Sequence, residues 1–256
     1  MEVQSLSLRE LRRYRKQIMI PGIGIEGQEK LKKASVLVIG AGGMGCPVLQ
    51  YLAAAGIGKI GIVEFDFVDE TNLHRQILYG SGDPGKLKSV IAKLRLEQLN
   101  PLIVTEVFNL RLDKHNAPDC IREYDIIVDA TDNFETRYVI NDACVILNKP
   151  MVHGAIYKFE GQVSVFNYHD GPTYRCYNPQ QKDTVLTNQA PSETGLFGVL
   201  PGITGTIMAI EVLKIITGTG TVLSGKLLLF NILDYSFHLI QIRNNPENHN
   251  IKMDPD

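Results

Sequence analysis

A short run of apolar, β-branched residues leads directly into a cluster of glycines, and this junction constrains the fold more than any other feature. Residues 35–39 read Ser-Val-Leu-Val-Ile, which predicts a strand buried on both faces. Residues 40–45, Gly-Ala-Gly-Gly-Met-Gly, match the pattern G-x-G-x-x-G, and a helix is predicted over residues 44–55. Glycines let backbone N–H groups approach a phosphate at the positive end of a helix. The junction therefore predicts a nucleotide-binding turn.

The hydrophobic pattern elsewhere alternates between strands and helices, which is typical of a doubly wound sheet. Further strands are predicted over residues 60–64, 103–107, 125–129, 150–156, 162–168, 226–232 and 237–242. Helices are predicted over residues 8–18, 24–33, 86–99, 133–147 and 203–217, and a long loop over residues 171–195. We predict an α/β fold with a Rossmann-like, mostly parallel sheet, continued by antiparallel strands and covered by helices on both faces.

The composition excludes several classes of protein. With 26 Lys and Arg against 28 Asp and Glu in 256 residues, the chain has no net field that favours nucleic acid. The charged N-terminus does not resemble a secretory signal, and Glu211 and Lys214 make residues 199–216 a better buried helix than a membrane span. The four cysteines form no C-x-x-C pair. We expect a cytoplasmic protein that binds neither nucleic acid nor membranes.

The side chains that follow the second strand carry more positive charge than a dinucleotide site needs. Glu64, 19 residues after Gly45, is placed to accept hydrogen bonds from ribose hydroxyls, as in NAD-dependent oxidoreductases. However, Arg75 and Lys88 are expected to point back toward the glycine turn, where they suit a triphosphate. The alternative is that both are solvated helix charges.

Residues 129–133, Asp-Ala-Thr-Asp-Asn, lie where the fourth strand of the nucleotide-binding part ends. Ligands bind at this carboxyl edge in doubly wound sheets, and a carboxylate there suits the Mg²⁺ that accompanies ATP. Asp132 is our candidate for that ligand, and a role as the N-cap of the following helix is the alternative interpretation.

Several motifs in a fixed order resemble the ThiF/MoeB/HesA family, relatives of the ubiquitin-activating enzymes. The resemblance covers roughly residues 8–243. It is carried by residues 13–17 (RYRKQ), 40–45 (GAGGMG), Asp66 with 72–76 (NLHRQ), 131–133 (TDN), 154–155 (GA), 160–162 (EGQ) and 198–205 (GVLPGITG). It implies an eight-stranded sheet, a homodimer, ATP with Mg²⁺, and adenylation of the C-terminal glycine carboxylate of a ubiquitin-like sulfur carrier.

The resemblance also assigns roles to individual residues. The catalytic set is Arg75, Lys88 and Asp132, and Asp132 also binds Mg²⁺. The implied nucleotide-binding residues are Gly40, Gly42, Gly43, Gly45, Glu64, Asp66, Asn72, Arg75, Gln76, Lys88, Thr131, Asn133 and Lys16 of the partner subunit. Lys16 stands where the family usually has an arginine, and Arg15 is the alternative cross-dimer cation.

Two features of the family are missing. Only Cys176 remains of the four zinc-binding cysteines that many members carry, so we predict no zinc. The crossover loop has no cysteine in residues 190–194, which excludes a covalent acyl intermediate there. Cys176 is the cysteine we consider for sulfur transfer, and we expect a surface or packing role for His74.

We therefore predict an adenylyltransferase that acts on a sulfur carrier ending in Gly-Gly, in thiamine synthesis (a ThiS-like carrier) or molybdopterin synthesis (a MoaD-like carrier), and that passes the product to a sulfur donor protein. The alternatives are a peptide-adenylating enzyme, an NAD-dependent oxidoreductase and an inactive scaffold. The expected single domain, residues 1–256, comprises a helical arm (1–34), a nucleotide-binding part (35–156), a carrier-binding part (157–243, with its crossover loop at about 171–195) and a frayed tail (244–256).

Overall fold

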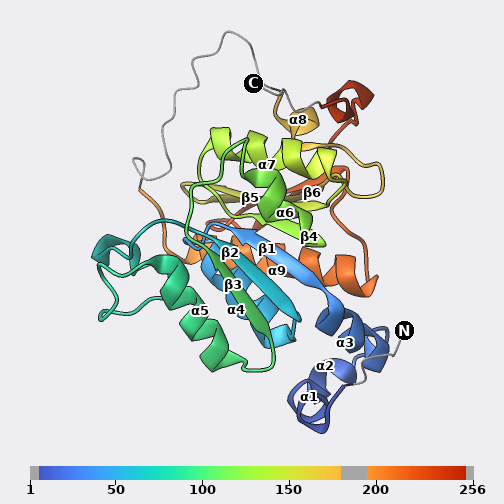
Figure 1. The fold of residues 1–256 in the computed structure, drawn as a ribbon. Helices are drawn as coiled ribbons and strands as arrows, with labels where there is room; N and C mark the ends of the chain where they lie inside the picture. Colours follow the sequence, from blue (N-terminus) through green and yellow to red (C-terminus); the bar gives the residue numbers. More distant parts are fainter. Residues whose placement is uncertain (1–5, 180–194, 252–256) are drawn as a thin grey trace.

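A mixed sheet with the strand order β3-β2-β1-β4-β5-β6-β7-β8 forms the centre of the computed structural model, which describes residues 6–179 and 195–251 (Figure 1). The strands are β1 (Ser35–Ile39), β2 (Lys59–Val63), β3 (Val104–Phe108), β4 (Ile126–Asp129), β5 (Met151–Tyr157), β6 (Glu160–Phe166), β7 (Lys226–Asn231) and β8 (Ser236–Gln241). Strands β1 to β5 pair in parallel, and β5 to β8 pair antiparallel. The predicted eight-stranded, mostly parallel sheet is confirmed.

Helices cover both faces of the sheet, because the apolar side chains of the central strands alternate between two cores. In β1, Val36 and Val38 pack into one core, and Leu37 and Ile39 into the other. The first core includes residues of α3 (Gly24–Lys33), α4 (Gly45–Ala55), α5 (Lys88–Leu99) and α9 (Val199–Thr217). The second includes residues of α6 (Ala117–Arg122), α7 (Phe134–Ile146) and α8 (Tyr174–Tyr177).

The glycine turn lies between β1 and α4, where the strand order reverses from β1–β2 to β1–β4. Ligands bind at such switch points in open α/β sheets. Gly40 has φ +94°, a conformation that favours glycine, and a Cβ at Gly45 would lie 2.0 Å from the carbonyl oxygen of Gly40. These two glycines therefore allow the chain to turn tightly from strand into helix.

The N-terminal arm, α1 (Leu8–Arg13), α2 (Arg15–Ile18) and α3, is anchored at the far end of α4 from the glycine turn. The hydroxyl of buried Tyr14 accepts a hydrogen bond from Asn100 Nδ2 (2.8 Å), and the Tyr14 ring lies against Gly56, which ends α4. Because α4 has 11 residues and rises about 1.5 Å per residue, this contact lies about 16 Å from the glycine turn.

Three predictions about the C-terminal part are wrong in detail. Helix α9 begins at residue 199 rather than 203, because Pro201 is tolerated in a first helical turn. The predicted loop contains α8, which buries Tyr174 in the second core, although most of that loop (180–194) lies outside the described residues. The predicted frayed tail forms a 3₁₀ helix over Pro246–His249, capped by Asn245; its last residues, 252–256, are also not described.

Within the described residues, α9 alone is long and apolar enough to cross a membrane. Its buried Glu211 accepts a hydrogen bond from the backbone N–H of Leu223 (2.8 Å) and pairs with Lys214. Its Met208 packs so closely on β5 that a Cβ at Gly154 would meet the sulfur at 2.3 Å. These contacts identify α9 as a core helix of this domain.

Candidate active site

A cavity of about 370 Å³ opens at the carboxyl ends of the parallel strands. Eleven of the residues implied by the family resemblance line it: Gly40, Gly42, Gly43, Glu64, Asp66, Arg75, Gln76, Lys88, Thr131, Asp132 and Asn133. The structure thus brings together residues from five separate segments of the chain. The cavity is large enough for a small organic ligand.

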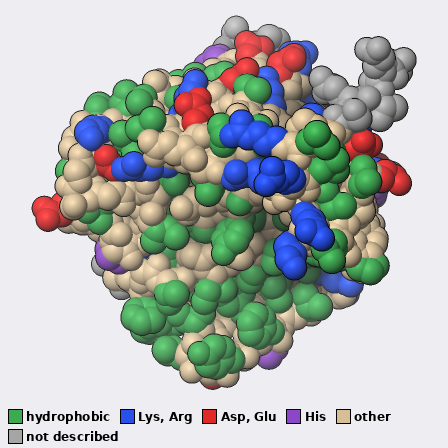
Figure 2. Space-filling model, turned by 90° about the horizontal axis from the view of Figure 1, so that it is seen from below, with side chains coloured by type: hydrophobic (Ala, Val, Ile, Leu, Met, Phe, Trp, Pro, Cys, Tyr) green, Lys and Arg blue, Asp and Glu red, His purple; other side chains and the backbone are tan. Residues whose placement is uncertain are grey.

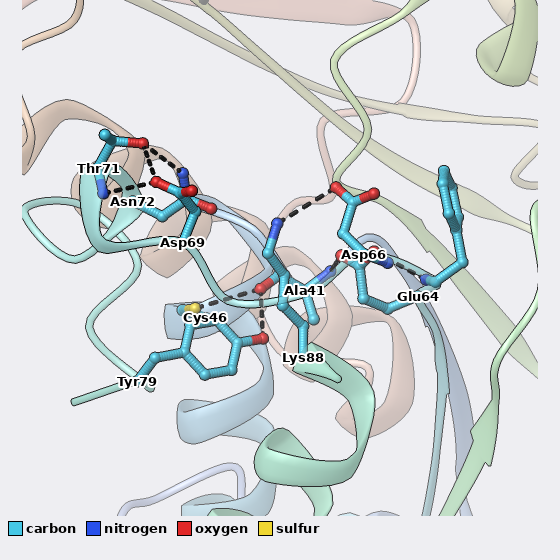
Figure 3. Close-up of polar contacts among 10 residues, drawn as sticks. Ala41, Cys46, Glu64, Asp66, Asp69, Thr71, Asn72, Tyr79 and Lys88 are labelled. Carbon is cyan, nitrogen blue, oxygen red and sulfur yellow. Dashed lines mark hydrogen bonds and ion pairs between the residues drawn. The ribbon is translucent and has the colours of Figure 1, made fainter. Parts of the chain in front are cut away.

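Glu64 holds the glycine turn in place. Its Oε2 accepts the backbone N–H of Ala41 (2.9 Å), and its Oε1 accepts the N–H groups of Phe65 and Asp66 (2.9 Å each). On the other side of Ala41, the carbonyl oxygen accepts the hydroxyl of Tyr79 at 2.8 Å (Figure 3). The backbone of the turn is therefore clamped from both sides before any ligand is present.

Cys46 takes part in the same clamp and is not a reactive thiol. Its Sγ donates to the carbonyl oxygen of Ala41 at 3.4 Å, as Figure 3 shows. Burial raises the pKa of Cys46 to about 12 and outweighs its position in the first turn of α4, which by itself would lower the pKa.

Residues 72–76 pack directly against the glycine turn. The carbonyl oxygen of Asn72 accepts the N–H groups of Arg75 (3.0 Å) and Gln76 (2.9 Å), which turns both side chains toward the cavity. A Cβ at Gly42 would lie 3.6 Å from Gln76 Nε2. The Oε1 of Gln76 is buried and has no hydrogen-bond partner in the described part of the chain.

Lys88 lies at the start of α5 and is nearly buried, with 7% of its side chain exposed. Its Nζ is 3.2 Å from Asp66 Oδ2, and its backbone N–H donates to the carbonyl oxygen of Asp66 (2.9 Å). The interpretation of Lys88 as a solvated helix charge is therefore wrong. Its ammonium group instead lies in the cavity wall, paired with a half-exposed carboxylate (Figure 3).

A buried polar network supports the opposite wall of the cavity, at the end of β4. Asp129 Oδ1 accepts the N–H (3.0 Å) and hydroxyl (2.6 Å) of Thr131, and Oδ2 lies 2.7 Å from Nδ1 of His153. Arg137 donates from Nη2 to the carbonyl oxygen of Thr131 (2.9 Å). The network fixes the backbone immediately before Asp132.

The protonation of this network follows from its burial. Burial by itself raises the pKa of Asp129, but hydrogen bonds from His153 and Thr131 and the charge of Arg137 outweigh it, so the pKa lies below the usual range. Burial lowers the pKa of His153, against the opposing effect of Asp129. We therefore infer an ionised Asp129 beside a neutral His153, with Nδ1–H as the donor.

Asp132 and Asn133 follow the network and have different surroundings. Asn133 is the N-cap of α7, where its side chain accepts the N–H of Thr136 (2.9 Å), so the N-cap interpretation of Asp132 is wrong. Asp132 is exposed and lines the cavity. Its carboxylate is therefore available to a ligand.

Sequence reasoning missed two arginines in the cavity wall, Arg111 and Arg137. Arg137 follows Asn133 by four residues on α7, so the helical period already placed it on the face that carries the cap. Arg111 follows β3, whose carboxyl end lies at the same edge of the sheet as the other site residues. Its guanidinium pairs with Glu135 at 3.3 Å.

Three predicted site residues do not line the cavity: Gly45, Asn72 and Lys16. Gly45 allows close packing of α4 on the turn, and Asn72 orients its neighbours through its carbonyl oxygen. Lys16 is exposed on the arm, at the far end of α4. That Lys16 binds the nucleotide of a neighbouring subunit stays a prediction.

Cys176, at the one remaining position of the family's zinc cysteines, lies among amide groups. Its Sγ is 3.4 Å from Thr173 Oγ1 and accepts hydrogen bonds from Asn245 N (3.4 Å) and Asn248 Nδ2 (3.5 Å). Burial alone raises the pKa of Cys176, but these hydrogen bonds lower it below its usual range. The absence of zinc stays a prediction.

Comparison with known proteins places this geometry in a family context. Residues 14–251 match the ThiF family. A sulfur carrier protein adenylyltransferase from Thermus thermophilus is 50% identical over 242 residues, which cover 93% of this chain and 89% of that protein. A probable molybdopterin-synthase adenylyltransferase from Porphyra purpurea is 50% identical over 240 residues, and this chain spans only 62% of its length.

A solved structure shares the fold. The crystal structure of E. coli MccB with MccA-N7isoASN superposes with a TM-score of 0.82 at 24% identity, and the match covers 94% of this chain and 74% of that one. At this level of identity the likeness establishes the common architecture alone.

Proposed function

Because this chain belongs to the ThiF family, we propose that it uses ATP to adenylate the C-terminal glycine carboxylate of a ubiquitin-like sulfur carrier. The observation that carries the proposal is the convergence of Arg75, Lys88 and Asp132 around the glycine turn, in one cavity. The similarity to a sulfur carrier protein adenylyltransferase, over nearly the full length of both chains, supports the same activity.

The charges in the cavity suit this reaction. An oxygen of the carrier's carboxylate attacks the α-phosphorus of ATP, the bond to the bridging oxygen breaks, and pyrophosphate leaves with its electron pair. Two negatively charged reactants must meet, so cations that offset their repulsion accelerate the step. Arg75 and Lys88 supply them from one wall. No general base is required, because the carboxylate is already ionised at pH 7.

The donor set in the cavity fits Mg²⁺ bound together with nucleotide phosphates. Asp132 presents an exposed carboxylate, and no cluster of three or more His, Cys, Asp or Glu side chains suited to a metal is found in residues 6–179 and 195–251. Mg²⁺ commonly binds through one or two carboxylates, substrate phosphates and water rather than a full protein cage. Asp132 would hold the ion at the β4 wall, where it would neutralise phosphate charge.

A homodimer would complete the site with Lys16 of the partner subunit, or with Arg15 in its place. Figure 2 shows Lys and Arg side chains gathered on the face seen from below, next to a broad hydrophobic area. Large hydrophobic side chains are exposed on the arm (Met19, Ile20, Ile25) and on α9 (Ile203, Ile210). Such surfaces are characteristic of subunit interfaces.

The product is an acyl-adenylate on the carrier, which a sulfur donor protein would consume. The relatives' names support both a generic sulfur carrier and the molybdopterin pathway, so ThiS-like and MoaD-like carriers are both candidate substrates. We place the reaction in the cytoplasm. An NAD-dependent oxidoreductase would leave Arg75, Lys88 and Asp132 without a function, and the relatives' names do not favour it.

ATP–pyrophosphate exchange tests the proposal directly. Purified protein is incubated with ATP, Mg²⁺ and labelled pyrophosphate, and carriers ending in Gly-Gly are added one at a time. We expect exchange only with a cognate carrier, and none with the same carrier lacking its last glycine. Tight NAD binding without exchange for any carrier would contradict the proposal.

A further inference from the structure

His74 lies between Arg75 and the start of α9. Its Nε2 is 2.8 Å from Nη1 of Arg75. On its other side, a Cβ at Gly198, the N-cap of α9, would lie 2.4 Å from the His74 carbonyl oxygen and 2.9 Å from its Nδ1. The imidazole is therefore in contact with the arginine on one side and with the backbone before α9 on the other.

The direction of the hydrogen bond between His74 and Arg75 is set by chemistry. A guanidinium group has donors and no acceptor, so Nη1 donates and Nε2 accepts. The imidazole is then neutral, with its proton on Nδ1. The same Nη1 also donates to the carbonyl oxygen of Thr71 at 3.0 Å. Two acceptors thus hold one corner of the guanidinium.

The remaining donors of Arg75 are left for a ligand. Across residues 6–179 and 195–251, neither Nε nor Nη2 of Arg75 has a recorded protein acceptor. The stem of the side chain lies over the glycine turn, since a Cβ at Gly43 would be 3.8 Å from Arg75 Cγ. An arginine confined at its stem and at one nitrogen loses little further conformational freedom when it binds an anion.

We propose that His74 is a positioning residue for Arg75: its neutral imidazole accepts from Nη1 and holds the guanidinium over the glycine turn, with the free N–H groups facing the nucleotide phosphates. This inference rests on the proposed function and deepens it, because it adds a residue outside the nucleotide-binding set. His74 is exposed and lines the cavity, so this inference adds a role in the site to the expected surface or packing role.

The test compares two substitutions at His74 by calorimetry on the full chain, with ATP and AMP as ligands. Gln can place a carbonyl oxygen near the position of Nε2, and Leu cannot accept a hydrogen bond. We expect His74→Leu to weaken ATP binding by about 3- to 10-fold, the effect of one lost hydrogen bond, and His74→Gln to retain most of the affinity. AMP binding should change by less than about twofold in both variants, because AMP lacks the β- and γ-phosphates.

A double substitution shows whether His74 acts through Arg75. In Arg75→Ala, the additional change His74→Leu should cost no further ATP affinity. His115→Leu is the matched control, because His115 is an exposed histidine outside the cavity lining, and it should leave ATP affinity unchanged.

Three results would overturn the inference. The first is that His74→Leu weakens the binding of ATP and AMP equally. The second is that His74→Leu leaves ATP affinity unchanged although Arg75→Ala lowers it. The third is that the losses of ATP affinity in the two single variants add up in the double variant. Each leaves the proposed function intact if wild-type protein still exchanges pyrophosphate. Wild-type protein that binds no ATP would instead overturn both.

Discussion

Two aspartates three residues apart have opposite surroundings at the end of β4. Asp129 is fully buried, and its carboxylate accepts hydrogen bonds from Thr131 and His153, inside the fold. Asp132 is exposed in the cavity and has no hydrogen bond or ion pair recorded in the described residues. The carboxylate of Asp129 therefore stabilises the loop that follows β4, whereas the carboxylate of Asp132 is left exposed for a ligand.

Removal of the buried carboxylate should have the largest effect. In Asp129→Ala, His153 and Arg137 lose their shared partner, and a buried cation is left uncompensated. We expect the free energy of unfolding to fall by about 3–5 kcal/mol, measured by urea denaturation. Asp132→Ala is the matched control and should change it by no more than about 0.5 kcal/mol. Equal losses in the two variants would contradict the assigned difference between the two aspartates.

The exposed carboxylate should instead matter for turnover. We expect Asp132→Ala to lower the rate of carrier-dependent pyrophosphate exchange by about 100- to 1000-fold, the typical effect of removing one preorganised electrostatic group. Nucleotide affinity should fall much less, because the glycine turn, Arg75 and Lys88 remain. Calorimetry with ATP separates the two quantities. Unchanged pyrophosphate release in this variant would refute the catalytic assignment.

The pH dependence of stability tests the neutral state of His153. Burial lowers the pKa of His153, so below about pH 6.5 the unfolded chain takes up a proton that the folded chain does not. Stability should therefore fall as the pH drops from 6.5 toward the folded-state pKa, by up to about 1.4 kcal/mol per pH unit.

His153→Gln isolates this contribution, because the variant lacks the titrating imidazole. Its unfolding free energy should vary less than that of wild type between pH 7.5 and 5.5. Asp129 does not contribute in this window, since its lowered pKa confines its own loss of stability to pH values below about 3.9. Parallel curves for wild type and variant would mean that folding does not lower the pKa of His153.

The smallest effect is expected at the rim of the cavity. Arg111 and Glu135 pair at 3.3 Å with 68% and 80% of their side chains exposed. Exposed ion pairs of this kind contribute little to the free energy of unfolding. Glu135→Gln should therefore change it by less than about 0.5 kcal/mol. Thermal denaturation of the variant beside wild type measures the change. A loss near that of Asp129→Ala would show that exposure does not explain the contrast.

The fold was predictable because its signals are local. Hydrophobic runs such as residues 35–39 and the glycine pattern at 40–45 depend on neighbours in sequence. Where a prediction is wrong, tertiary contacts decide the outcome. The four residues of α8 are too few to show a helical period, and their helix is stabilised by Tyr174 in an aromatic cluster with Tyr138 and Phe166.

Most of the residues in the site could be predicted from the sequence, but only some of their roles could. Most of the residues implied by the resemblance line the cavity. Yet Glu64, expected to bind ribose, accepts hydrogen bonds from Ala41 in the glycine turn and from the backbone that follows β2. Likewise, Asn133 rather than Asp132 caps α7. No pattern in the sequence shows which of several nearby N–H and O–H groups will donate a hydrogen bond to a given carboxylate.

The sequence by itself determined the α/β architecture, the family and most of the residues that meet at the carboxyl edge of the sheet, because hydrophobic patterns and motif spacing are local features. Only the tertiary structure decided the state of each group: Asp129 buried and Asp132 exposed, Cys46 inert, and Arg75 held by His74. The physical reason is that burial and hydrogen bonding depend on segments far apart in the chain. They control which polar groups a protein uses for itself and which it leaves for a ligand.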